Sequence, residues 1–514
     1  MMQKKTYLGI ELGSTRIKAC LIDGSLQPIS SGSFEWENSY ENGYWTYALD
    51  DIQSGVRNCF SSLKEDAEKK LEAPFTYVDA IGISGMMHGY LVFDKDDNLL
   101  VPFRTWRNTT ASKAAKKLSK FFNYNIPDRW SIAHLYQAII DGEKHVSQIA
   151  HITTVAGYIH YLLTGEWEVG IGEASGIFPI SNGSYDKEML VKFDELIRQR
   201  GFEWNISDIL PKVKFAGEKG TMLTEKGAIF LDDTGVLKAG IPICPPEGDA
   251  GTGMVATNSV LPGTGNVSAG TSVFSMLVLE KEIENFYHEI DVVATPDGSP
   301  VAMIHSNNGC SELDVWINMF CEFSQLMGIK ADKSVLYEKL YKNTLNADKD
   351  CGGIMSYNFL ASEPVAGVRA GKPMYFRNIE SKMTLANFFR SQIYSAIAVL
   401  KMGINILSEK ENVLIQKINA HGGLFKVEGV AQQLLANVLG AKVAVSKTSG
   451  EGGAWGMALL SAYMVENCGE NLGIWLSKNV FAEMNMVEIA PDKEETMGFE
   501  KYFNEFIDGL KIFR

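Results

Sequence analysis

Short apolar runs separated by turn residues open the chain. Residues 6 to 35 predict three short strands, with turns at 13–15 and 23–24. From about Asp50, apolar residues recur every three or four positions, which is the spacing of a helix with one buried face. The next apolar run, Val78 to Gly85, is typical of a buried strand that ends in glycine. Because strands and helices are mixed along the chain, the pattern predicts an α/β layer architecture.

The opening pattern occurs a second time in the other half of the chain. Residues 262–280 (PGTGNVSAGTSVFSMLVLE) read as a strand, a Gly-Thr-Ser turn and another apolar strand. Two such copies predict two related lobes, and we place the boundary near Asn258, which gives domains at 1–257 and 258–514. Further helices are expected at 147–165 and 384–407, and a strand, a Gly-Gly turn, a helix and a strand are expected between 417 and 446.

Length and composition limit the classes of function. With 514 residues the chain exceeds the size at which one hydrophobic core stops growing, so two domains are expected. The formal charge of −14 argues against a nucleic-acid partner, because such binding needs Lys and Arg along the phosphates. Seven cysteines without a CxxC pair argue against a disulfide framework and a zinc site. No apolar run resembles a signal-peptide core or a membrane span, so we expect a cytoplasmic protein with no membrane partner.

The two turns rich in Gly, Ser and Thr are candidate phosphate contacts. Gly13-Ser14-Thr15 and Gly270-Thr271-Ser272 offer main-chain N–H groups and hydroxyls at matching positions of the two lobes, where an ATP polyphosphate could be held. A chance duplication of an ordinary strand connection is the alternative. The Gly422-Gly423 turn enters a helix, where N–H groups can face a nucleotide, although a plain strand-to-helix connection also explains it. Glycines 450, 452, 453 and 456 surround another helix start, and close packing is their expected role.

Asp249 is a candidate for catalysis, and Glu11 is a second carboxylate of interest. Asp249 lies in a segment rich in Gly and Pro (CPPEGDAGTGMVAT) near the predicted boundary. There it could accept a proton from a substrate hydroxyl, as phosphoryl transfer to an alcohol requires, and a turn-forming Asp is the alternative. Glu11 lies in a predicted strand whose next turn is a candidate phosphate contact, and the alternative is that its carboxylate is simply solvated.

Polar and flat side chains that suit a sugar follow the strand at 78–85. Met87 and His88 come directly after that strand, and a structural role for a lone histidine is the alternative. Further along, Trp106, Arg107 and Asn108 lie in a predicted loop. They combine a flat apolar face with polar donors, which is the mixture that a sugar needs.

Taken together and in this order, the motifs resemble the FGGY carbohydrate kinases, in the wider superfamily of sugar kinases, actin and the heat-shock chaperone ATPases. YLGIELGSTRIKACLID (7–23) and GTGNVSAGTS (263–272) look like the two phosphate motifs of the family. INAHGGLFKVEGVAQQLLANVLG (418–440) resembles its adenosine motif. ISGMMHG (83–89) is similar to the ISGQMHG segment of xylulokinases, and EGDAGTGM (247–254) resembles the segment that carries the catalytic aspartate.

This resemblance implies a fold, two cofactors and a set of site residues. The fold would be α/β, with two ribonuclease-H-like domains of the actin-like ATPase type and a cleft between them. The sugar would lie mainly against 1–257 and ATP mainly against 258–514, with Mg²⁺ at the phosphates and Asp249 as general base. The implied contacts are Met87, His88, Trp106, Asn108 and Asp249 for the sugar; Gly13, Ser14, Thr15, Arg16, Gly270, Thr271, Ser272, Gly422, Gly423 and Asn437 for ATP; and Glu11 and Asp249 for the metal.

Several positions depart from the family pattern. Glu11 stands where the family usually has Asp, Met86 replaces the usual Gln, and Ala250 follows the catalytic Asp where xylulokinases tend to have Asn. TWRNTT (105–110) replaces a WNDGR-like loop. We therefore predict an ATP-dependent kinase that phosphorylates a hydroxyl, expected to be primary, of a ketose or related polyol. The sequence does not identify which sugar. A non-catalytic nucleotide-binding sugar sensor on the same scaffold is the alternative, and a homodimer is compatible with the sequence.

Overall fold

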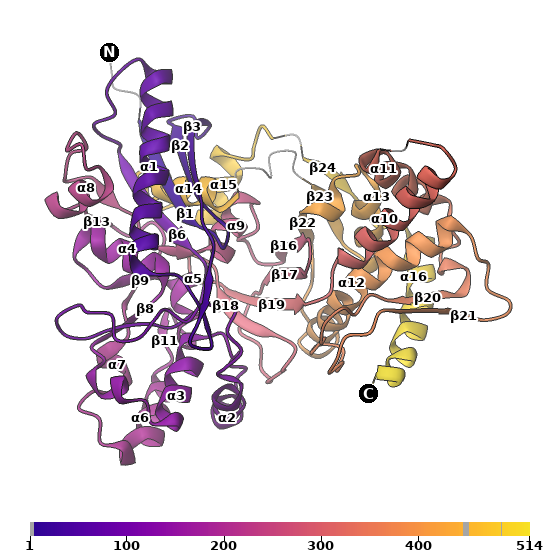
Figure 1. Cartoon of the computed structure of the whole chain (residues 1–514), viewed down its shortest axis with the longest axis horizontal. Coiled ribbons are helices and arrows are strands. Elements are labelled where there is room, and N and C mark those ends of the chain that lie inside the picture. The colour runs from indigo at the N-terminus through magenta and orange to yellow at the C-terminus, as the bar shows by residue number, and fades with distance from the viewer. Residues whose placement is uncertain (1–4, 331, 446–451, 485, 514) are drawn as a thin grey trace. The chain divides into compact units, whose positions relative to one another are not determined.

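The computed structural model describes residues 5–330, 332–445, 452–484 and 486–513 (Figure 1). The chain forms two compact units. The first unit consists of Met1–Val260, Val292–Val301 and Gly450–Met484. The second unit consists of Leu261–Asp291, Ala302–Ser449 and Asn485–Arg514. Each unit is built around a seven-stranded sheet.

The sheet of the first unit begins with the three strands predicted at 6–35. These are β1 (Thr6–Leu12), β2 (Arg16–Asp23) and β3 (Pro28–Glu35), so that prediction is confirmed. β1 pairs antiparallel with β2 and parallel with β6 (Ala80–Gly85). The strand order is β13-β14-β6-β1-β2-β3, and β15 also pairs with β6. The short members are β13 (Thr221–Met222), β14 (Pro242–Ile243) and β15 (Glu247–Gly248).

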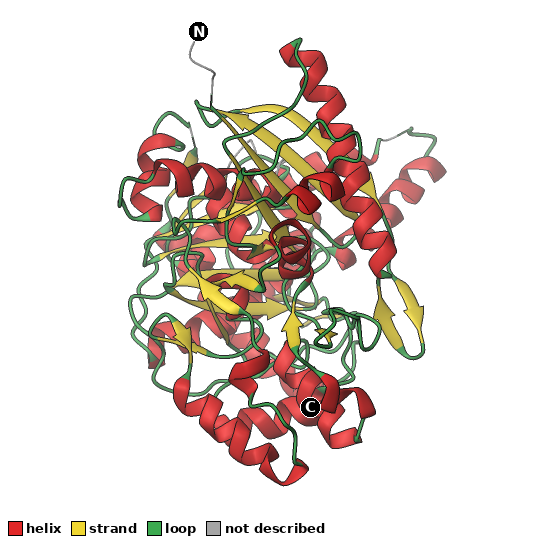
Figure 2. Ribbon diagram, turned by 90° about the vertical axis from the view of Figure 1, so that its left-hand side faces the viewer, coloured by secondary structure: helices red, strands yellow, loops and turns green. Residues whose placement is uncertain are grey.

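Helices cover this sheet (Figure 2). The helix predicted from about Asp50 is confirmed as α1 (Leu49–Leu71), which packs its buried side chains against β2 and β3. α4 (Val155–Thr164) packs against β6. α14 (Gly452–Glu466) packs against β1, β6 and α9 (Asp249–Ala256), and in Figure 1 its yellow ribbon lies among the indigo strands. Residues 452–484 therefore fold with the N-terminal strands, whereas a division at residue 257 assigns them to the second lobe.

Glycine permits the close packing between β1 and α14. A Cβ at Gly9 would lie 2.2 Å from the Ala454 carbonyl oxygen, and one at Gly456 would lie 2.1 Å from the Thr252 carbonyl oxygen. Main-chain atoms cannot move aside as a flexible side chain can. These contacts fit the packing role expected for the glycines at the start of α14, although Gly450 lies outside the described residues.

Replacing Gly9 by Ala is expected to lower the free energy of unfolding by at least about 1–3 kcal/mol, because the added methyl group overpacks the β1–α14 contact. The matched control is Gly253→Ala in α9, where a Cβ would meet nothing within 4 Å. Thermal unfolding of both variants checks the result. The close-packing explanation is wrong if Gly9→Ala and Gly253→Ala melt at the same temperature.

The helix predicted at 147–165 is wrong in its first half. The chain there forms the end of a 3₁₀ turn (Lys144–Gln148) and strand β8 (His151–Thr153), and only α4 is helical. β8 pairs with β7 (Leu91–Phe93), and the Thr154 side chain accepts a hydrogen bond from the Gly157 N–H, which caps α4. The predicted end at Gly165 is confirmed, since this residue is the left-handed C-cap.

The second unit repeats the hairpin that opens the first. The sheet that contains this second hairpin has the order β18-β19-β17-β16-β22-β23-β24, in which β16 (Thr264–Ala269) pairs antiparallel with β17 (Val273–Val278) and parallel with β22 (Lys417–His421). The predicted long helix is confirmed as α12 (Leu385–Lys410), and the predicted strand, turn, helix and strand after it are β22, a Gly-Gly turn, α13 (Val430–Leu439) and β23 (Lys442–Val445). The other sheet strands are β18 (Asp291–Ala294), β19 (Pro300–Ser306) and β24 (Val487–Ile489), and the main helices are α10 (Ser311–Leu326), α11 (Lys333–Asn343) and α16 (Lys493–Gly509).

The first unit also contains three smaller elements. They are β5 (Tyr44–Thr46), α5 (Ile171–Ala174) and α3 (Ser131–Asp141). Across the ranges that the structure describes, no helix has both the length and the apolar composition needed to cross a membrane.

Candidate active site

Asp249 is the first residue of α9 and follows β15 directly. β15 runs parallel to β6, with Gly248 opposite Gly85. Because the carboxyl ends of the two strands meet at the same edge of the sheet, Asp249 lies beside the residues that follow β6. The Met87 N–H donates a hydrogen bond of 3.2 Å to the Asp249 carboxylate, and the Ala250 N–H donates one of 2.9 Å. The structure thus brings Asp249 and Met87 together, and their contacts with a sugar remain predictions.

The Asp249 carboxylate is suited to accept a proton. Its side chain remains exposed on one side, so a substrate can reach it. Surrounding protein removes part of its hydration and raises the pKa of its carboxyl above the usual range. A carboxylate that is held by two N–H groups, reachable and more basic than usual can act as a general base.

Glu11 lies in β1, and its charge interacts with that of Asp249. Burial, together with the negative charge of Asp249, raises the pKa of Glu11 to about 7, while Lys18 on β2 opposes the shift. The Ala454 N–H near the start of α14 also bonds to Glu11. Glu11 and Asp249 are both oxygen donors and repel each other when ionised, so a divalent cation between them fits the donor set. Among the described residues, no group of three or more His, Cys, Asp or Glu side chains could hold a metal.

His88 lies under the same edge of the sheet. It is 6% exposed, has a positive φ of 73°, and its Nδ1 lies 3.3 Å from the Gly176 carbonyl oxygen. Burial, with a smaller effect from the Arg129 charge, lowers its pKa well below the usual range, so the imidazole is neutral. A Cβ at Gly176 would lie 2.5 Å from His88 Nδ1 and 2.8 Å from Met87 Cε, which places both predicted sugar residues against the same glycine.

The predicted sugar loop is arranged differently. Asn108 is 3% exposed, and its amide donates to the carbonyl oxygens of Trp45 and Thr105 while accepting from the Trp45 N–H. Its side chain therefore ties the loop to β5 and has both amide hydrogens in use. Trp106 is 42% exposed. No contact among the described residues joins Trp106 or Asn108 to His88 or Asp249, so their sugar contacts remain predictions.

Sequence reasoning missed two buried carboxyl groups beneath Asp249. Glu173 in α5 is fully buried and Glu247 in β15 is 1% exposed. A Glu247 carboxylate oxygen accepts a hydrogen bond of 3.0 Å from the Glu173 N–H, and a Cβ at Gly248 would lie 2.4 Å from a Glu173 carboxylate oxygen. Burial raises the pKa of Glu247 to about 8 and that of Glu173 well above the usual range. At neutral pH these groups support the peptide that carries Asp249 while adding little negative charge.

The first predicted phosphate turn joins β1 to β2. The Gly13 N–H donates to the Arg16 carbonyl oxygen at 3.1 Å, and the Tyr47 hydroxyl donates to the Ser14 carbonyl oxygen at 2.6 Å. Thr15 and Arg16 are exposed, and Arg16 pairs with Glu35 at 2.5 Å. These hydrogen bonds hold the hairpin in place, and part of its surface stays exposed. Its contact with phosphate remains a prediction.

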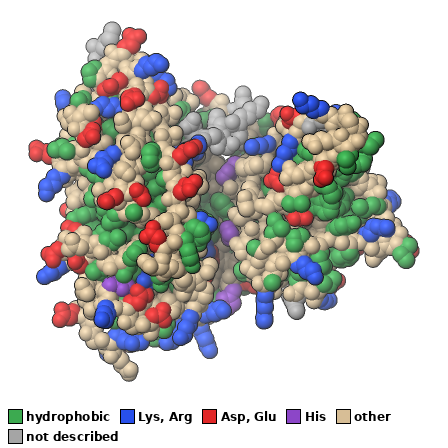
Figure 3. All heavy atoms as spheres, in the orientation of Figure 1, with side chains coloured by type: hydrophobic (Ala, Val, Ile, Leu, Met, Phe, Trp, Pro, Cys, Tyr) green, Lys and Arg blue, Asp and Glu red, His purple; other side chains and the backbone are tan. Residues whose placement is uncertain are grey.

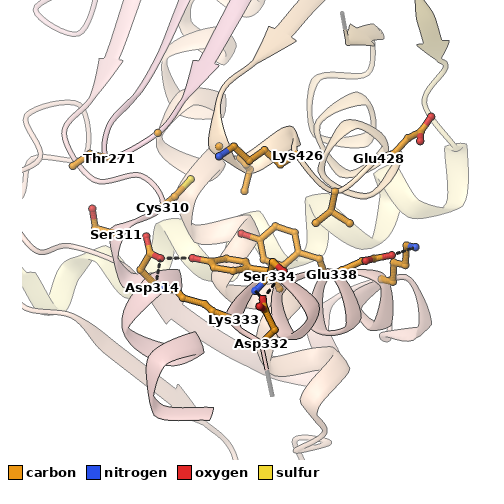
Figure 4. Close-up of a pocket in the computed structure, with 17 residues that line it drawn as sticks. Thr271, Cys310, Ser311, Asp314, Asp332, Lys333, Ser334, Glu338, Lys426 and Glu428 are labelled. Carbon is orange, nitrogen blue, oxygen red and sulfur yellow. Dashed lines mark hydrogen bonds and ion pairs between the residues drawn. The ribbon is translucent and has the colours of Figure 1, made fainter. Parts of the chain in front are cut away.

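The second unit contains a cavity of about 910 Å³ beside the other two predicted turns (Figure 4). Because β16 and β22 are parallel neighbours, with Ser268 opposite His421, the turns that follow them come together at one edge of the sheet. Gly270, Thr271 and Gly423 line the cavity. Ser272 and Gly422 adjoin these residues in the chain, and Gly422 has a φ of 106°.

Asn437 is placed elsewhere. It is fully buried in α13, and its side-chain oxygen accepts from the Gln433 amide at 3.0 Å and from the Asp492 N–H at 2.8 Å. It is not among the described residues that line the cavity. Its contact pattern ties α13 to the start of α16, and a contact with ATP stays a prediction.

Two helices that sequence reasoning did not connect with a ligand form the opposite wall of the cavity. Asp314 of α10 pairs with Lys333 of α11 at 3.2 Å and accepts a hydrogen bond from the Tyr337 hydroxyl (Figure 4). The Tyr337 and Tyr341 rings lie 5.6 Å apart, centre to centre. Lys426 lines the cavity from the segment after the Gly-Gly turn. Aromatic faces, a carboxylate and ammonium groups are the components needed to hold a base, a ribose and phosphates.

The architecture is that of the two-domain actin-like ATPases: a mixed α/β sheet in each unit, with a β-hairpin beside a crossover strand. Residues 6–256 match the model of the N-terminal domain of the FGGY family of carbohydrate kinases, and residues 265–465 match that of its C-terminal domain. These two matches cover most of the chain. The chain belongs to the FGGY family of carbohydrate kinases.

Individual relatives agree with this assignment. A xylulose kinase of Haemophilus influenzae is 24% identical over 474 residues, which cover 85% of this chain and 86% of that protein. The solved structures of a ligand-bound xylulose kinase and of a gluconate kinase, both from Lactobacillus acidophilus, each match with a TM-score of 0.79 and 16% identity, over 99% of this chain and 98% of theirs. The chain is a sugar kinase similar to xylulose kinases, and the same fold serves kinases named for different substrates.

Proposed function

We propose that the chain transfers the γ-phosphoryl group of ATP to a hydroxyl of a ketose, xylulose-like or ribulose-like, or of a related polyol. The observation that carries this proposal is the Asp249 carboxylate, which is reachable, raised in pKa and held beside Met87. A binding protein needs no base at that place. The non-catalytic sensor is therefore not favoured.

In this proposal the first unit binds the sugar and provides the base. Asp249 accepts the hydroxyl proton as the oxygen attacks the phosphorus, and the N–H groups of Met87 and Ala250 hold the carboxylate in place. Neutral His88 and the Met87 side chain contact the sugar. Glu11 and Asp249 would hold Mg²⁺, directly or through its waters. When bound, Mg²⁺ neutralises charge on the phosphates.

ATP is proposed to bind in the cavity of the second unit. Its volume, about 910 Å³, lies within the range for small-molecule and cofactor sites. Gly270, Thr271, Ser272, Gly422 and Gly423 would contact the phosphates through main-chain N–H groups and hydroxyls. Tyr337 of α11 would pack against the base. The hairpin at 13–16 is a further candidate for phosphate contact within the first unit.

Filling the cavity is expected to weaken ATP binding in proportion to the volume added. Gly423 has a negative φ and lines the cavity, and a Cβ there would meet nothing within 4 Å. Gly423→Phe should raise the KM for ATP by about 10-fold or more, because the ring takes up cavity volume, while Gly423→Ala should change it by less than about 3-fold. Initial-rate kinetics with varied ATP check the series. Equal KM values for the two variants would exclude this cavity as the ATP site.

Removing His88 is expected to affect the sugar more than ATP. In His88→Ala, kcat/KM for the sugar should fall by about 10-fold or more because a sugar hydroxyl loses its buried partner, while the KM for ATP changes little. His145, a second buried histidine of the same unit, provides the matched control His145→Ala. Equal losses for sugar and ATP in His88→Ala would support a purely structural histidine.

A turnover screen tests the proposed function and identifies the substrate class. Purified protein with magnesium and ATP is assayed for ADP release against ketoses, aldoses and polyols, with a reaction lacking sugar as control. We expect release that depends on a ketose or polyol, because the chain is similar to xylulose kinases over most of its length. Release with no acceptor, or with aldoses alone, would contradict the proposal.

A further inference from the structure

Glu363 is a buried carboxylate of the second unit that the proposed reaction does not use. Charged side chains of both signs are spread over the visible surface of the chain, where water solvates them (Figure 3). Glu363 is instead 0% exposed, and it lies between β20 (Ile354–Tyr357) and β21 (Met374–Arg377). Burying a carboxylate costs free energy unless hydrogen-bond donors satisfy it, so the donors around Glu363 show what this side chain holds.

Three donors at the C-terminal end of β19 bind the Glu363 carboxylate. Its Oε2 accepts a hydrogen bond from the Ser306 hydroxyl at 2.9 Å, from the Asn308 N–H at 3.2 Å and from the Asn308 side-chain amide at 3.0 Å. The Asn308 side-chain oxygen accepts in turn from the Ala361 N–H at 2.8 Å. Asn308 is therefore held through both its main chain and its side chain.

The residues that follow Asn308 hold the second predicted phosphate turn. The Gly309 N–H donates a hydrogen bond of 2.8 Å to the Thr271 carbonyl oxygen. The Cys310 N–H donates one of 2.8 Å to the Gly270 carbonyl oxygen. A Cβ at Gly309 would lie 2.6 Å from the same Gly270 oxygen, so the two segments are in close contact. Figure 4 shows Thr271 and Cys310 on the same side of the cavity, which both of them line.

These two hydrogen bonds also set the direction of N–H groups in the turn. In a trans peptide the N–H points opposite to the C=O. Because the carbonyl groups of Gly270 and Thr271 point toward residues 309–310, the N–H groups of Thr271 and Ser272 are directed away from those residues. Thr271 is exposed, so an anion can approach the turn. A turn that presented its carbonyl oxygens to the ligand would repel phosphate instead.

We propose that Glu363 is a positioning residue for the phosphates of ATP, because it holds Asn308 and thereby the residues that fix the turn at 270–271. Since ATP is proposed to bind in this cavity, the role of Glu363 rests on that proposed function. Glu363 is not among the described residues that line the cavity, and it acts only through Asn308 and its neighbours. Without the carboxylate the turn should lose its fixed orientation, so phosphate binding weakens while nucleoside binding does not.

Isothermal titration calorimetry with ADP and with adenosine tests this role, because only ADP carries phosphates. Glu363→Ala should raise the Kd for ADP by about 10-fold or more and leave the Kd for adenosine within about 2-fold. Glu363→Gln keeps one oxygen that can accept from Ser306 and Asn308, so it should raise the Kd for ADP by less than about 3-fold. Asn308→Ala removes the same link from its other end. Its effect should match that of Glu363→Ala, and the two effects should not add in the double variant.

Glu411→Ala is the matched control. Glu411 is another buried glutamate of the second unit, 7% exposed, and its carboxylate accepts hydrogen bonds from the N–H groups of Glu284 and Asn285. The Asn285 side-chain amide and the Tyr287 hydroxyl donate to it as well. None of these residues is among those described as lining the cavity. Glu411→Ala should lower the melting temperature as Glu363→Ala does, while the Kd for ADP stays within about 2-fold of the wild type.

Four results would overturn the role of Glu363. One is a Kd for ADP that does not rise in Glu363→Ala although the wild type binds ADP, which would leave the ATP site itself intact. Another is a rise that adenosine or Glu411→Ala shares, because a general loss of structure would then explain it. Failure of both Glu363→Ala and Asn308→Ala to fold would show that the link serves folding alone. A wild type that does not bind ADP would overturn the ATP site together with this role.

Discussion

Asp249→Asn is expected to lower kcat for sugar phosphorylation by 10²- to 10⁴-fold, which corresponds to about 3–5 kcal/mol of activation free energy. The amide has the shape of the carboxylate and keeps an oxygen that can accept from the N–H groups of Met87 and Ala250. It has no basic site for the hydroxyl proton. The protein should therefore fold and bind ATP as before, while the chemical step slows. Single-turnover kinetics, together with equilibrium binding of ATP, measure both effects.

The control for this variant is Asp233→Asn, which changes an exposed aspartate outside the site in the same way. It should leave kcat, ATP binding and melting temperature unchanged. If Asp249→Asn turns over at a rate near that of the wild type, Asp249 is not the base. If ATP binding or folding is lost along with turnover, the lower rate comes from the fold or from the metal site, and the assignment of Asp249 as the base is not supported.

Glu11→Gln is expected to lower kcat by about 10- to 100-fold and to weaken the dependence of turnover on magnesium, the range typical of residues that support a metal site. The amide cannot balance the cation charge that Glu11 and Asp249 would share. The pKa of Glu11, about 7, adds a second readout. As pH falls through 7 the carboxyl takes up a proton, so the magnesium concentration for half-maximal rate should rise in the wild type and stay flat in Glu11→Gln.

Glu11→Asp is the matched variant, because it keeps the charge and shortens the side chain by one methylene. It should retain substantial activity, with an altered preference between magnesium and manganese. Glu41→Gln, at an exposed glutamate of the same unit, should leave the magnesium titration unchanged. A magnesium titration and turnover that are the same in Glu11→Gln and the wild type would make Glu11 a bystander.

Much of the fold follows from local patterns. The sequence predicts the strands at 6–35, the long helix at 385–410 and the run from β22 to β23. Apolar periodicity and glycine turns indicate them because these signals act over a few residues. The packing of α14 within the first unit cannot be predicted from such local patterns. Its partners in β1 are more than 400 residues away, and the match between them depends on the absence of a side chain at Gly9.

Sequence motifs indicate some residues of the candidate site. Residues that reach the site only through packing have no such signal in the sequence. Asp249, Met87 and the turns at 270–271 and 423 stand in recognisable segments, and the structure places each beside a strand end. Glu173 and Glu247 lie in short segments rich in glycine or proline that show no apolar periodicity, and the fold buries them. The cavity wall formed by α10 and α11 carries no sequence motif. An apolar pattern can predict a helix, but it does not predict the ligand beside that helix.

Phosphorus-31 NMR of a reaction with the best acceptor, magnesium and ATP tests the central claim most directly. The account predicts that the γ-phosphate signal of ATP is replaced by that of a sugar phosphate ester, with an equal amount of ADP, and that Asp249→Asn stops this conversion. Inorganic phosphate as the only new signal, or an unchanged spectrum with every ketose and polyol tested, would contradict it.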